Sequence, residues 1–278
     1  MLHRSVARSL LLAILAVAAL AARPASRAPD PYRILVTNDD GVRAPGILAV
    51  AQALQGLGDV TIIAPSENQS GKGHSITISD PIYADAVTLP GGVAATALTA
   101  TPASCVKVAI KALMRDRPDL VVSGINRGYN LGVVTYVSGT VGAAREAALA
   151  GVPAVAASLA LEQNDYGPAA QIVRQVAERV KQHGLDRGVF LNVNVPPGAI
   201  NGIRVTTQSR QAGDEHFEQQ KTPWGRRYFW SVWKDPKGDS EGTDVWATDH
   251  GYAAVTPLRA SEFDPPAYET WRKRFTQQ

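Results

Sequence analysis

The sequence has little cysteine, no block of basic residues and only one long apolar run. Cys105 is the only cysteine of the 278 residues, so no disulfide can form within the chain. It shares a predicted helical face with small apolar residues, which favours a buried residue over a nucleophile. Lys and Arg total 28 against 25 Asp and Glu and are spread along the chain, which argues against a nucleic-acid duplex as partner. Beyond the N-terminus no run approaches a membrane span, so stable membrane insertion is not expected.

The N-terminal 22 residues have the pattern of a cleaved secretory signal peptide. Arg4 and Arg8 give a basic start, and an apolar run follows over residues 10–22. This run is short for a membrane span, and residues 19–21 (ALA) offer a small-x-small cleavage site. We therefore expect a periplasmic or secreted protein. The alternative is an uncleaved membrane anchor.

From residue 32 onward, strand-like and helix-like segments alternate. Apolar runs predict strands, and apolar residues at helical spacing predict helices between them. The predicted strands are 32–37, 59–64, 120–124, 154–159 and 190–195, and the predicted helices are 45–57, 102–115, 141–150 and 169–183. This order predicts an α/β fold, a Rossmann-like doubly wound and mostly parallel sheet with helices on both faces.

The pattern changes after about residue 200, which divides the chain into a core over residues 32–200 and an extension over 201–278. Strands are predicted at 204–208, 227–233 and 252–256, with little helix between them, and a short helix at 268–275. Four of the five Trp residues lie between Trp224 and Trp246. We read the extension as hairpin-rich and as a contact with further copies of the chain.

Two adjacent acids, Asp39 and Asp40, follow the first predicted strand directly. Neighbouring side chains of a strand point to opposite faces, so two acids within a buried strand would place one carboxylate in the core. The pair therefore belongs in the turn after the strand, where Gly41 lets the backbone bend. In an open α/β sheet this turn lies at the carboxyl edge, where ligands bind. Two carboxylates there favour a hard-cation site.

Three further polar clusters stand after predicted strands or before a predicted helix. They are residues 68–75 (NQSGKGHS), 123–130 (SGINRGYN) and 138–140 (SGT). Serine and asparagine oxygens suit Mg²⁺, Mn²⁺ or Ca²⁺ and suit zinc poorly. Ser-Gly-Thr at a helix N-terminus offers free N–H groups to an anion. In a doubly wound sheet all these clusters can meet at one edge.

Several motifs occur in order over roughly residues 32–258. They are 34–41 (ILVTNDDG), 44–46 (APG), 68–71 (NQSG), 101–106 (TPASCV), 123–126 (SGIN), 138–141 (SGTV), 192–196 (NVNVP) and 242–244 (GTD). Together these motifs resemble the SurE survival-protein family of metal-dependent acid phosphatases and 5′-nucleotidases. The resemblance implies hydrolysis of nucleoside monophosphates to nucleoside and phosphate, with homodimers or homotetramers as the assembly. It also implies one divalent cation, Mg²⁺ or Mn²⁺ foremost and Ca²⁺ as an alternative occupant, bound by Asp39, Asp40, Ser70 and Asn126.

The same resemblance implies phosphate contacts from Asn130, Ser138, Gly139 and Thr140, with Asp39 and Asp40 as the catalytic residues. The chain departs from the family at Val133 and Val134, where an acid is common. It also departs at Val137, which separates Tyr136 from Ser138, whereas in the family the tyrosine commonly adjoins the Ser-Gly-Thr segment. These differences affect the shape of the entrance to the substrate site. Two alternatives stay open: a non-catalytic periplasmic nucleotide- or phosphate-binding protein, and a broad-specificity phosphatase or exopolyphosphatase. His74 fits either a proton donor or an ordinary loop histidine.

Overall fold

The structure is a computed structural model that describes residues 31–276. The described residues from Tyr32 onward belong to one compact unit. The predicted signal peptide, residues 1–22, lies outside the described residues. Within the described part, no helix is both long and apolar enough to cross a membrane.

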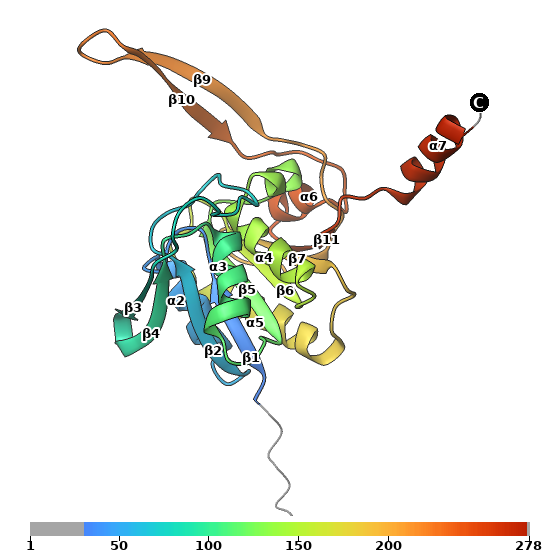
Figure 1. Ribbon diagram of the computed structural model, residues 1–278. Coiled ribbons are helices and arrows are strands. Elements are labelled where there is room, and N and C mark those ends of the chain that lie inside the picture. The colour runs from blue at the N-terminus through green and yellow to red at the C-terminus, as the bar shows by residue number, and fades with distance from the viewer. Residues whose placement is uncertain (1–30, 277–278) are drawn as a thin grey trace, which may run out of the picture. The chain divides into compact units, whose positions relative to one another are not determined.

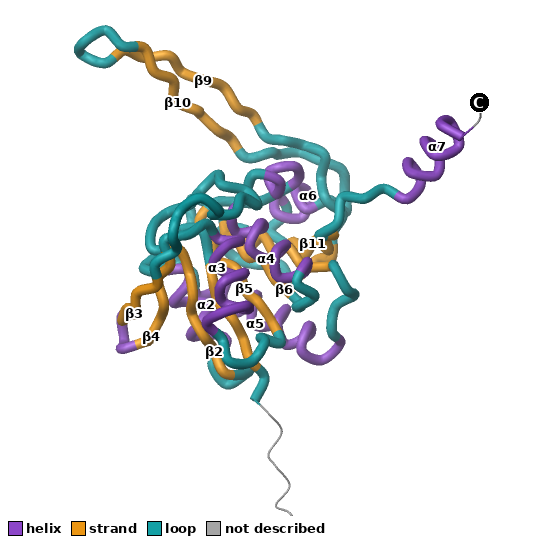
Figure 2. Tube along the Cα trace, in the orientation of Figure 1, coloured by secondary structure: helices purple, strands orange, loops and turns teal. Residues whose placement is uncertain are grey.

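Nine strands form one mostly parallel sheet in the order β3-β4-β2-β1-β5-β6-β7-β11-β8 (Figures 1 and 2). All neighbouring pairs are parallel except β3 with β4 and β7 with β11. The strands are β1 (Arg33–Thr37), β2 (Asp59–Pro65), β3 (Ala84–Leu89), β4 (Val93–Leu98), β5 (Leu120–Arg127), β6 (Ala154–Leu159), β7 (Val189–Val195), β8 (Ile203–Val205) and β11 (Ala253–Arg259). The predicted α/β class with a mostly parallel sheet is confirmed.

Helices cover both faces of the sheet. α2 (Pro45–Leu54) and α5 (Gly167–His183) share one apolar cluster with β1 and β5, and α3 (Pro102–Val108) and α4 (Gly139–Leu149) share a second cluster on the other face. α3 continues into the π-helical turn η2 (Ala109–Leu113). Cys105 is fully buried in the second cluster, as expected from its apolar neighbours, and burial raises its pKa to about 12.

From β1 the chain adds β2 on one side of the sheet and β5 on the other, so the order of strands reverses there. A ligand site is expected at this point. β1 pairs with β2 on one side and with β5 on the other, and both pairings are parallel. The carboxyl ends of β1 and β5 therefore open side by side at the topological switch point, where α/β sheets bind ligands. The 3₁₀ helix η3 (Gly132–Tyr136) and the start of α4 follow β5 along the chain.

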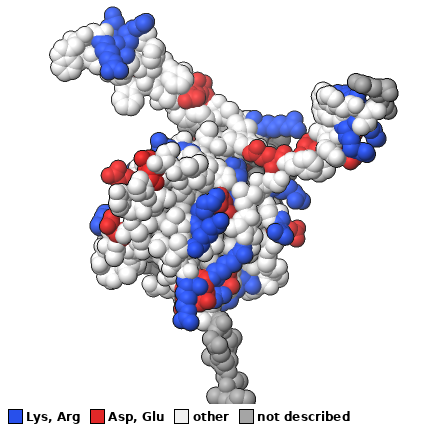
Figure 3. Space-filling model, viewed as in Figure 1, with Lys and Arg blue, Asp and Glu red and all other residues white. Residues whose placement is uncertain are grey.

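The chain beyond residue 200 adds two strands to the main sheet and a separate hairpin. β11 runs antiparallel to β7 and parallel to β8. β9 (Asp214–Lys221) and β10 (Arg227–Lys234) pair only with each other, and α6 (Asp244–Asp249) and α7 (Pro265–Thr276) complete the elements. Basic residues gather near the hairpin turn, whereas elsewhere in this view both signs are scattered (Figure 3).

The β3–β4 hairpin has no counterpart among the predicted elements. Its strands consist mainly of Ala, Thr and Val, and the turn is η1 (Pro90–Gly92). Small side chains give only a weak alternation of apolar and polar residues. The hairpin therefore depends on the pairing of β4 with β2 for its strand structure. β9 was also not predicted, because its sequence DEHFEQQK is charged and every residue is exposed.

Candidate metal and phosphate site

Asp39 lies two residues after the end of β1 and reaches the N-terminus of α4. Its Oδ1 accepts a hydrogen bond of 2.5 Å from the Thr140 hydroxyl, and the backbone N–H groups of Gly139 and Thr140 also donate to the carboxylate. Asp39 is only 3% exposed. Burial raises the pKa of Asp39, and these hydrogen bonds act in the opposite direction. The backbone N–H groups at the N-terminus of α4 thus hold the Asp39 carboxylate in place.

Asp40 is half-buried beside Asp39. Burial, and secondly the charge of Asp39, raise the pKa of Asp40 to about 6. A backbone N–H and the charge of Arg127, at the end of β5, oppose this rise. Two neighbouring carboxylates with so little compensating positive charge form a site that a cation would stabilise.

Ser70 and Asn126 lie at the same edge of the sheet as the acidic pair, and contacts of neighbouring residues place them there. The N–H of Gln69 donates to the backbone carbonyl of Asp39 at 2.7 Å, which brings the Ser70 loop against the acidic pair. Asn126 follows a register shift in β5. Its Nδ2 donates to the Gly128 carbonyl at 2.8 Å, so the amide orientation leaves Oδ1 as the free acceptor.

The three residues that begin α4 make different contacts. Ser138 caps the helix, since its Oγ accepts from the N–H of Val141 at 3.2 Å. Gly139 has no room for a side chain, because a Cβ there would lie 2.8 Å from the Cβ of Asp39. Thr140 is fully buried against Asp39. The segment predicted to bind phosphate therefore also fixes the first acid of the predicted metal site.

Asn130 lies in a buried hydrogen-bond network. Its Nδ2 donates to Ser158 Oγ at 2.7 Å, and its backbone N–H donates to Asn194 Oδ1 at 2.8 Å. Its carbonyl accepts from Nδ2 of both Asn192 and Asn194. These contacts tie the chain after β5 to β6 and β7, so Asn130 holds the wall of the site in position.

Sequence reasoning missed the supporting roles of Asn192, Asn194 and Asp244. The two asparagines are two positions apart in β7, a spacing that places both on one face of the strand and that could have identified them. Asp244 is fully buried and accepts from the backbone N–H groups of Gly132 and Ser209 at 2.9 and 2.8 Å. It thereby anchors η3.

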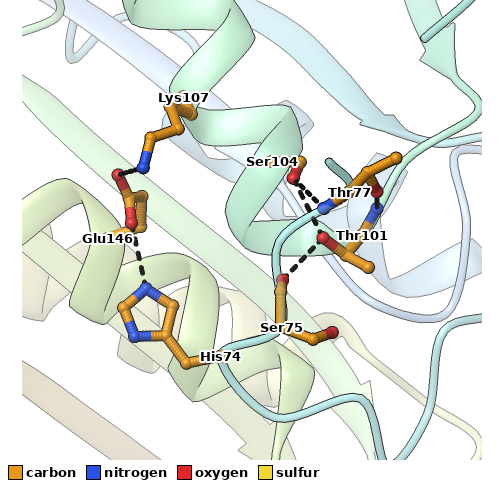
Figure 4. Close-up of polar contacts among 7 residues, drawn as sticks. All are labelled: His74, Ser75, Thr77, Thr101, Ser104, Lys107 and Glu146. Atoms are coloured by element: carbon orange, nitrogen blue, oxygen red, sulfur yellow. Dashed lines mark hydrogen bonds and ion pairs between the residues drawn. The ribbon is translucent and has the colours of Figure 1, made fainter. Parts of the chain in front are cut away.

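The loop that carries Ser70 is fastened to α3 and α4 (Figure 4). Glu146 Oε2 lies 3.0 Å from Nε2 of His74, and Glu146 Oε1 lies 3.1 Å from Nζ of Lys107. The hydrogen bond with His74 contributes most to lowering the pKa of Glu146. The N–H of Thr77 also donates to Ser104 Oγ. His74 therefore faces Glu146, a contact that fixes the loop.

The donor set favours a hard cation held partly by neutral oxygens. Among residues 31–276, no group of three or more His, Cys, Asp and Glu side chains could hold a metal ion. A metal at this edge thus needs oxygens from Ser, Asn or backbone beside the two acids. Buried side-chain oxygens of Thr37 and Asn38, at the end of β1, and of Ser123, the β5 residue that pairs with Thr37, have no hydrogen-bond partner among the described residues. This oxygen-only environment fits Mg²⁺, Mn²⁺ or Ca²⁺.

Comparisons with known proteins identify the family of this chain. The family model described as Survival protein SurE matches residues 34–215. A 5′-nucleotidase SurE from Syntrophotalea carbinolica is 45% identical over 229 residues, covering 81% of this chain and 90% of the relative. A 5′-nucleotidase SurE from Christiangramia forsetii is 39% identical over 244 residues, covering 84% of this chain and 92% of the relative.

The fold is also similar to that of a solved relative. The crystal structure of the SurE protein from Aquifex aeolicus superposes with a TM-score of 0.76 at 34% identity. The match covers 87% of this chain and 99% of the Aquifex chain. The sequence motifs, the sheet and these relatives together lead to one conclusion: the chain belongs to the SurE survival-protein family.

Proposed function

We propose that this chain is a divalent-metal-dependent phosphomonoesterase that hydrolyses nucleoside monophosphates to nucleoside and phosphate. The observation that carries the proposal is the pair Asp39 and Asp40 at the switch point, with Asp39 seated on the N-terminus of α4. Family membership supports it, since relatives are described as 5′-nucleotidase SurE. A protein that only bound phosphate would need anion donors but no paired carboxylates.

The residues proposed to hold one cation are Asp39, Asp40, Ser70 and Asn126. The two carboxylates balance the charge of a divalent ion, and the neutral serine and asparagine oxygens do not repel an incoming phosphate. Mg²⁺ or Mn²⁺ fits this set best, and Ca²⁺ is an alternative occupant. A cation bound there would polarise a phosphoryl oxygen and activate water.

The protein's own part in the reaction is to orient these groups and the substrate. Arg127 and the α4 N-terminus hold the two acids in place before substrate arrives. The proposed phosphate-binding groups are Asn130, Ser138, Gly139 and Thr140. The positive end of the α4 dipole favours a phosphate beside this segment, and such preorganised groups stabilise charge without reorganising during the reaction.

The test changes one acid at a time. Asp39→Asn and Asp40→Asn each remove one of two anionic ligands, so each is expected to weaken Mn²⁺ binding and phosphate release about 10-fold or more. Calorimetry with Mn²⁺ and a phosphate-release assay measure the two effects. Asp186→Asn changes an exposed acid elsewhere and serves as the control. An acid-pair variant that kept more than about a tenth of the wild-type rate would contradict the proposal.

A substrate panel separates this function from its alternatives. The panel contains 5′- and 3′-nucleotides, a simple aryl phosphate and polyphosphate. Hydrolysis of nucleotides in preference to the others supports the proposal. Equal hydrolysis of all monoesters, or preference for polyphosphate, indicates a broad phosphatase or an exopolyphosphatase. Nucleotide binding without hydrolysis under any divalent cation indicates a binding protein.

A further inference from the structure

A cavity of about 360 Å³, apart from the acidic pair, lies between α4 and the end of β11. Its lining comes from η3, from α4, from the end of β11 with the residues just after it, and from the segment after β8. The polar lining residues include Arg145, Arg259, Gln208 and Glu262. None of these residues belongs to the predicted metal or phosphate set. The cavity volume is sufficient for a small organic molecule.

Arg145 is the exceptional residue of this cavity. It is only 8% exposed, and its Nε is buried without a hydrogen-bond partner. Its guanidinium lies over the Tyr136 ring, 5.8 Å from the centroid, and no acid among the described residues forms an ion pair with it. The adjacent Glu146 faces the other side of α4, where it pairs with His74 and Lys107. A buried cation without an anion is costly, so its retention calls for a partner.

The other polar groups of the cavity do not supply that partner. Gln208 donates both to the Gly132 carbonyl, at 2.8 Å, and to Thr135 Oγ1, at 2.8 Å, so it serves to hold η3. Arg259 adds a second guanidinium and Glu262 a single carboxylate, which leaves the lining with an excess of positive charge. Guanidinium groups present a planar fork of N–H donors that matches a carboxylate or a phosphate.

We propose that this cavity is a binding site for a small oxyanion, a phosphate or carboxylate group of a soluble metabolite, held by Arg145 with Arg259. The site is separate from the acidic pair, although η3 lines the cavity with Thr135 and Tyr136 and leads directly into Ser138. The ligand replaces the missing counter-charge of Arg145. An amine or hydroxyl of the same molecule fits Glu262.

The test measures anion binding to the metal-depleted full chain. Inorganic phosphate, sulfate and citrate are titrated by calorimetry into wild type, Arg145→Met, Arg145→Lys and Arg179→Met. Sulfate and citrate are not products of the proposed reaction, so their binding is independent of nucleotidase activity. Arg179 is an exposed arginine of α5 and gives the matched loss of one charge.

Wild type is expected to bind at least one anion saturably at one site, and Arg145→Met to weaken it about 10-fold or more, because a charge-assisted bidentate contact is lost. Arg145→Lys is expected to fall between the two, and Arg179→Met to match wild type. The preferred anion is expected to raise the unfolding temperature of wild type and not that of Arg145→Met, whose own stability is expected to be at least equal to that of wild type.

Three results would overturn the proposal. One is the absence of saturable binding of all three anions up to about 10 mM, the weak end of specific affinity. Another is equal binding by wild type and Arg145→Met. The third is a change of oligomeric mass in Arg145→Met without a change in anion binding, which would assign the guanidinium to an interface between copies.

Discussion

At the scale of single residues, the position of Asp39 depends on the absence of a side chain at Gly139. A Cβ at residue 139 would lie 2.8 Å from the Asp39 Cβ, closer than such atoms pack, and 3.0 Å from its Oδ2, so Asp39 would have to shift. The neighbouring Thr140 hydroxyl and backbone amides then direct the carboxylate. One glycine thus links the start of α4 to the geometry of the acidic pair.

Gly139→Ala is therefore expected to displace Asp39 and to weaken Mn²⁺ binding about 10-fold or more while the chain still folds. The atoms nearest to the added methyl belong to the Asp39 side chain, and Pro102 Cγ follows at 3.2 Å. Calorimetry with Mn²⁺ and urea unfolding check the two parts. Ala143→Gly, in the same helix, is the control: it costs stability by about 1 kcal/mol through helix propensity but leaves Asp39 in place. Unchanged Mn²⁺ affinity in Gly139→Ala would contradict the role of Gly139 in positioning Asp39 for the metal.

At the scale of elements, the loop after β2 is held by helices distant in sequence. Glu146 of α4 contacts His74 of the loop and Lys107 of α3, and Gly142 permits close approach of Gly73, whose carbonyl would lie 2.3 Å from an added Cβ. Ser70 lies in the same loop. The packing of α3 against α4 therefore determines where a predicted metal ligand lies.

Glu146→Gln tests this anchor through its pH dependence. The folded-state pKa of Glu146 lies below its ordinary value of 4.5, so the carboxylate stabilises the fold above that pH and loses this effect as the pH falls through the folded-state pKa. The variant is expected to lower the unfolding free energy at pH 7 by about 1–3 kcal/mol, and by progressively less below about pH 4.5. Urea unfolding at neutral and acid pH measures the difference.

Glu178→Gln is the matched control, since Glu178 forms a partly exposed pair with Arg174 on α5. Exposed pairs of this kind contribute about 0.5 kcal/mol or less, so this variant is expected to change little at either pH. An equal loss of stability for Glu146→Gln at pH 7 and at acid pH would show that the ionised contact does not stabilise the loop.

At the scale of the whole molecule, the hairpin and α7 leave much apolar surface uncovered. Trp224, Phe229 and Trp230 of the hairpin region are 59–90% exposed. Trp271 and Phe275 of α7 are 54% and 77% exposed, and α7 buries no residue within the described chain. Aromatic surface of this kind marks a protein contact.

We propose that the mature protein is a homodimer or homotetramer joined through residues 201–278. Light scattering at micromolar concentration is expected to give a mass that is a multiple of the chain mass, because the exposed aromatics become buried between copies. Truncation after residue 260 removes α7 and tests its share separately. A monomeric full-length protein would refute the assembly, whereas an intact oligomer after truncation would remove only α7 from the interface.

We also propose that the chain is exported and cleaved near Ala21 or Ala22. The basic start, the apolar run and the small-x-small site provide the physical basis. N-terminal sequencing of the protein from its native host, after separation of periplasm and cytoplasm, gives the result. Protein that kept Met1 in the soluble cytoplasmic fraction would contradict export.

The sequence alone determined the order of strands and helices in the core, apart from the β3–β4 hairpin, and the place of the acidic pair. Apolar periodicity is a local property of the sequence, so it can be read without knowing the fold. Two adjacent acids after a buried strand belong in the turn, because burying one of their carboxylates in the core would be costly. The mostly parallel sheet followed from the alternation of elements. The small-residue β3–β4 hairpin and the charged β9 escaped prediction because pairing with other strands, rather than local pattern, stabilises them.

Only the tertiary structure decided which distant groups meet. Asp39 and Thr140 are 101 positions apart, and Asn130 and Asn194 are 64 apart, yet both pairs are hydrogen-bonded. The same packing turned Glu146 toward His74 and left Arg145 lining a cavity with no ion-pair partner among the described residues. Contacts between residues so far apart in sequence depend on how the helices pack on the sheet. The local spacing of apolar residues does not indicate which side chains this packing brings together.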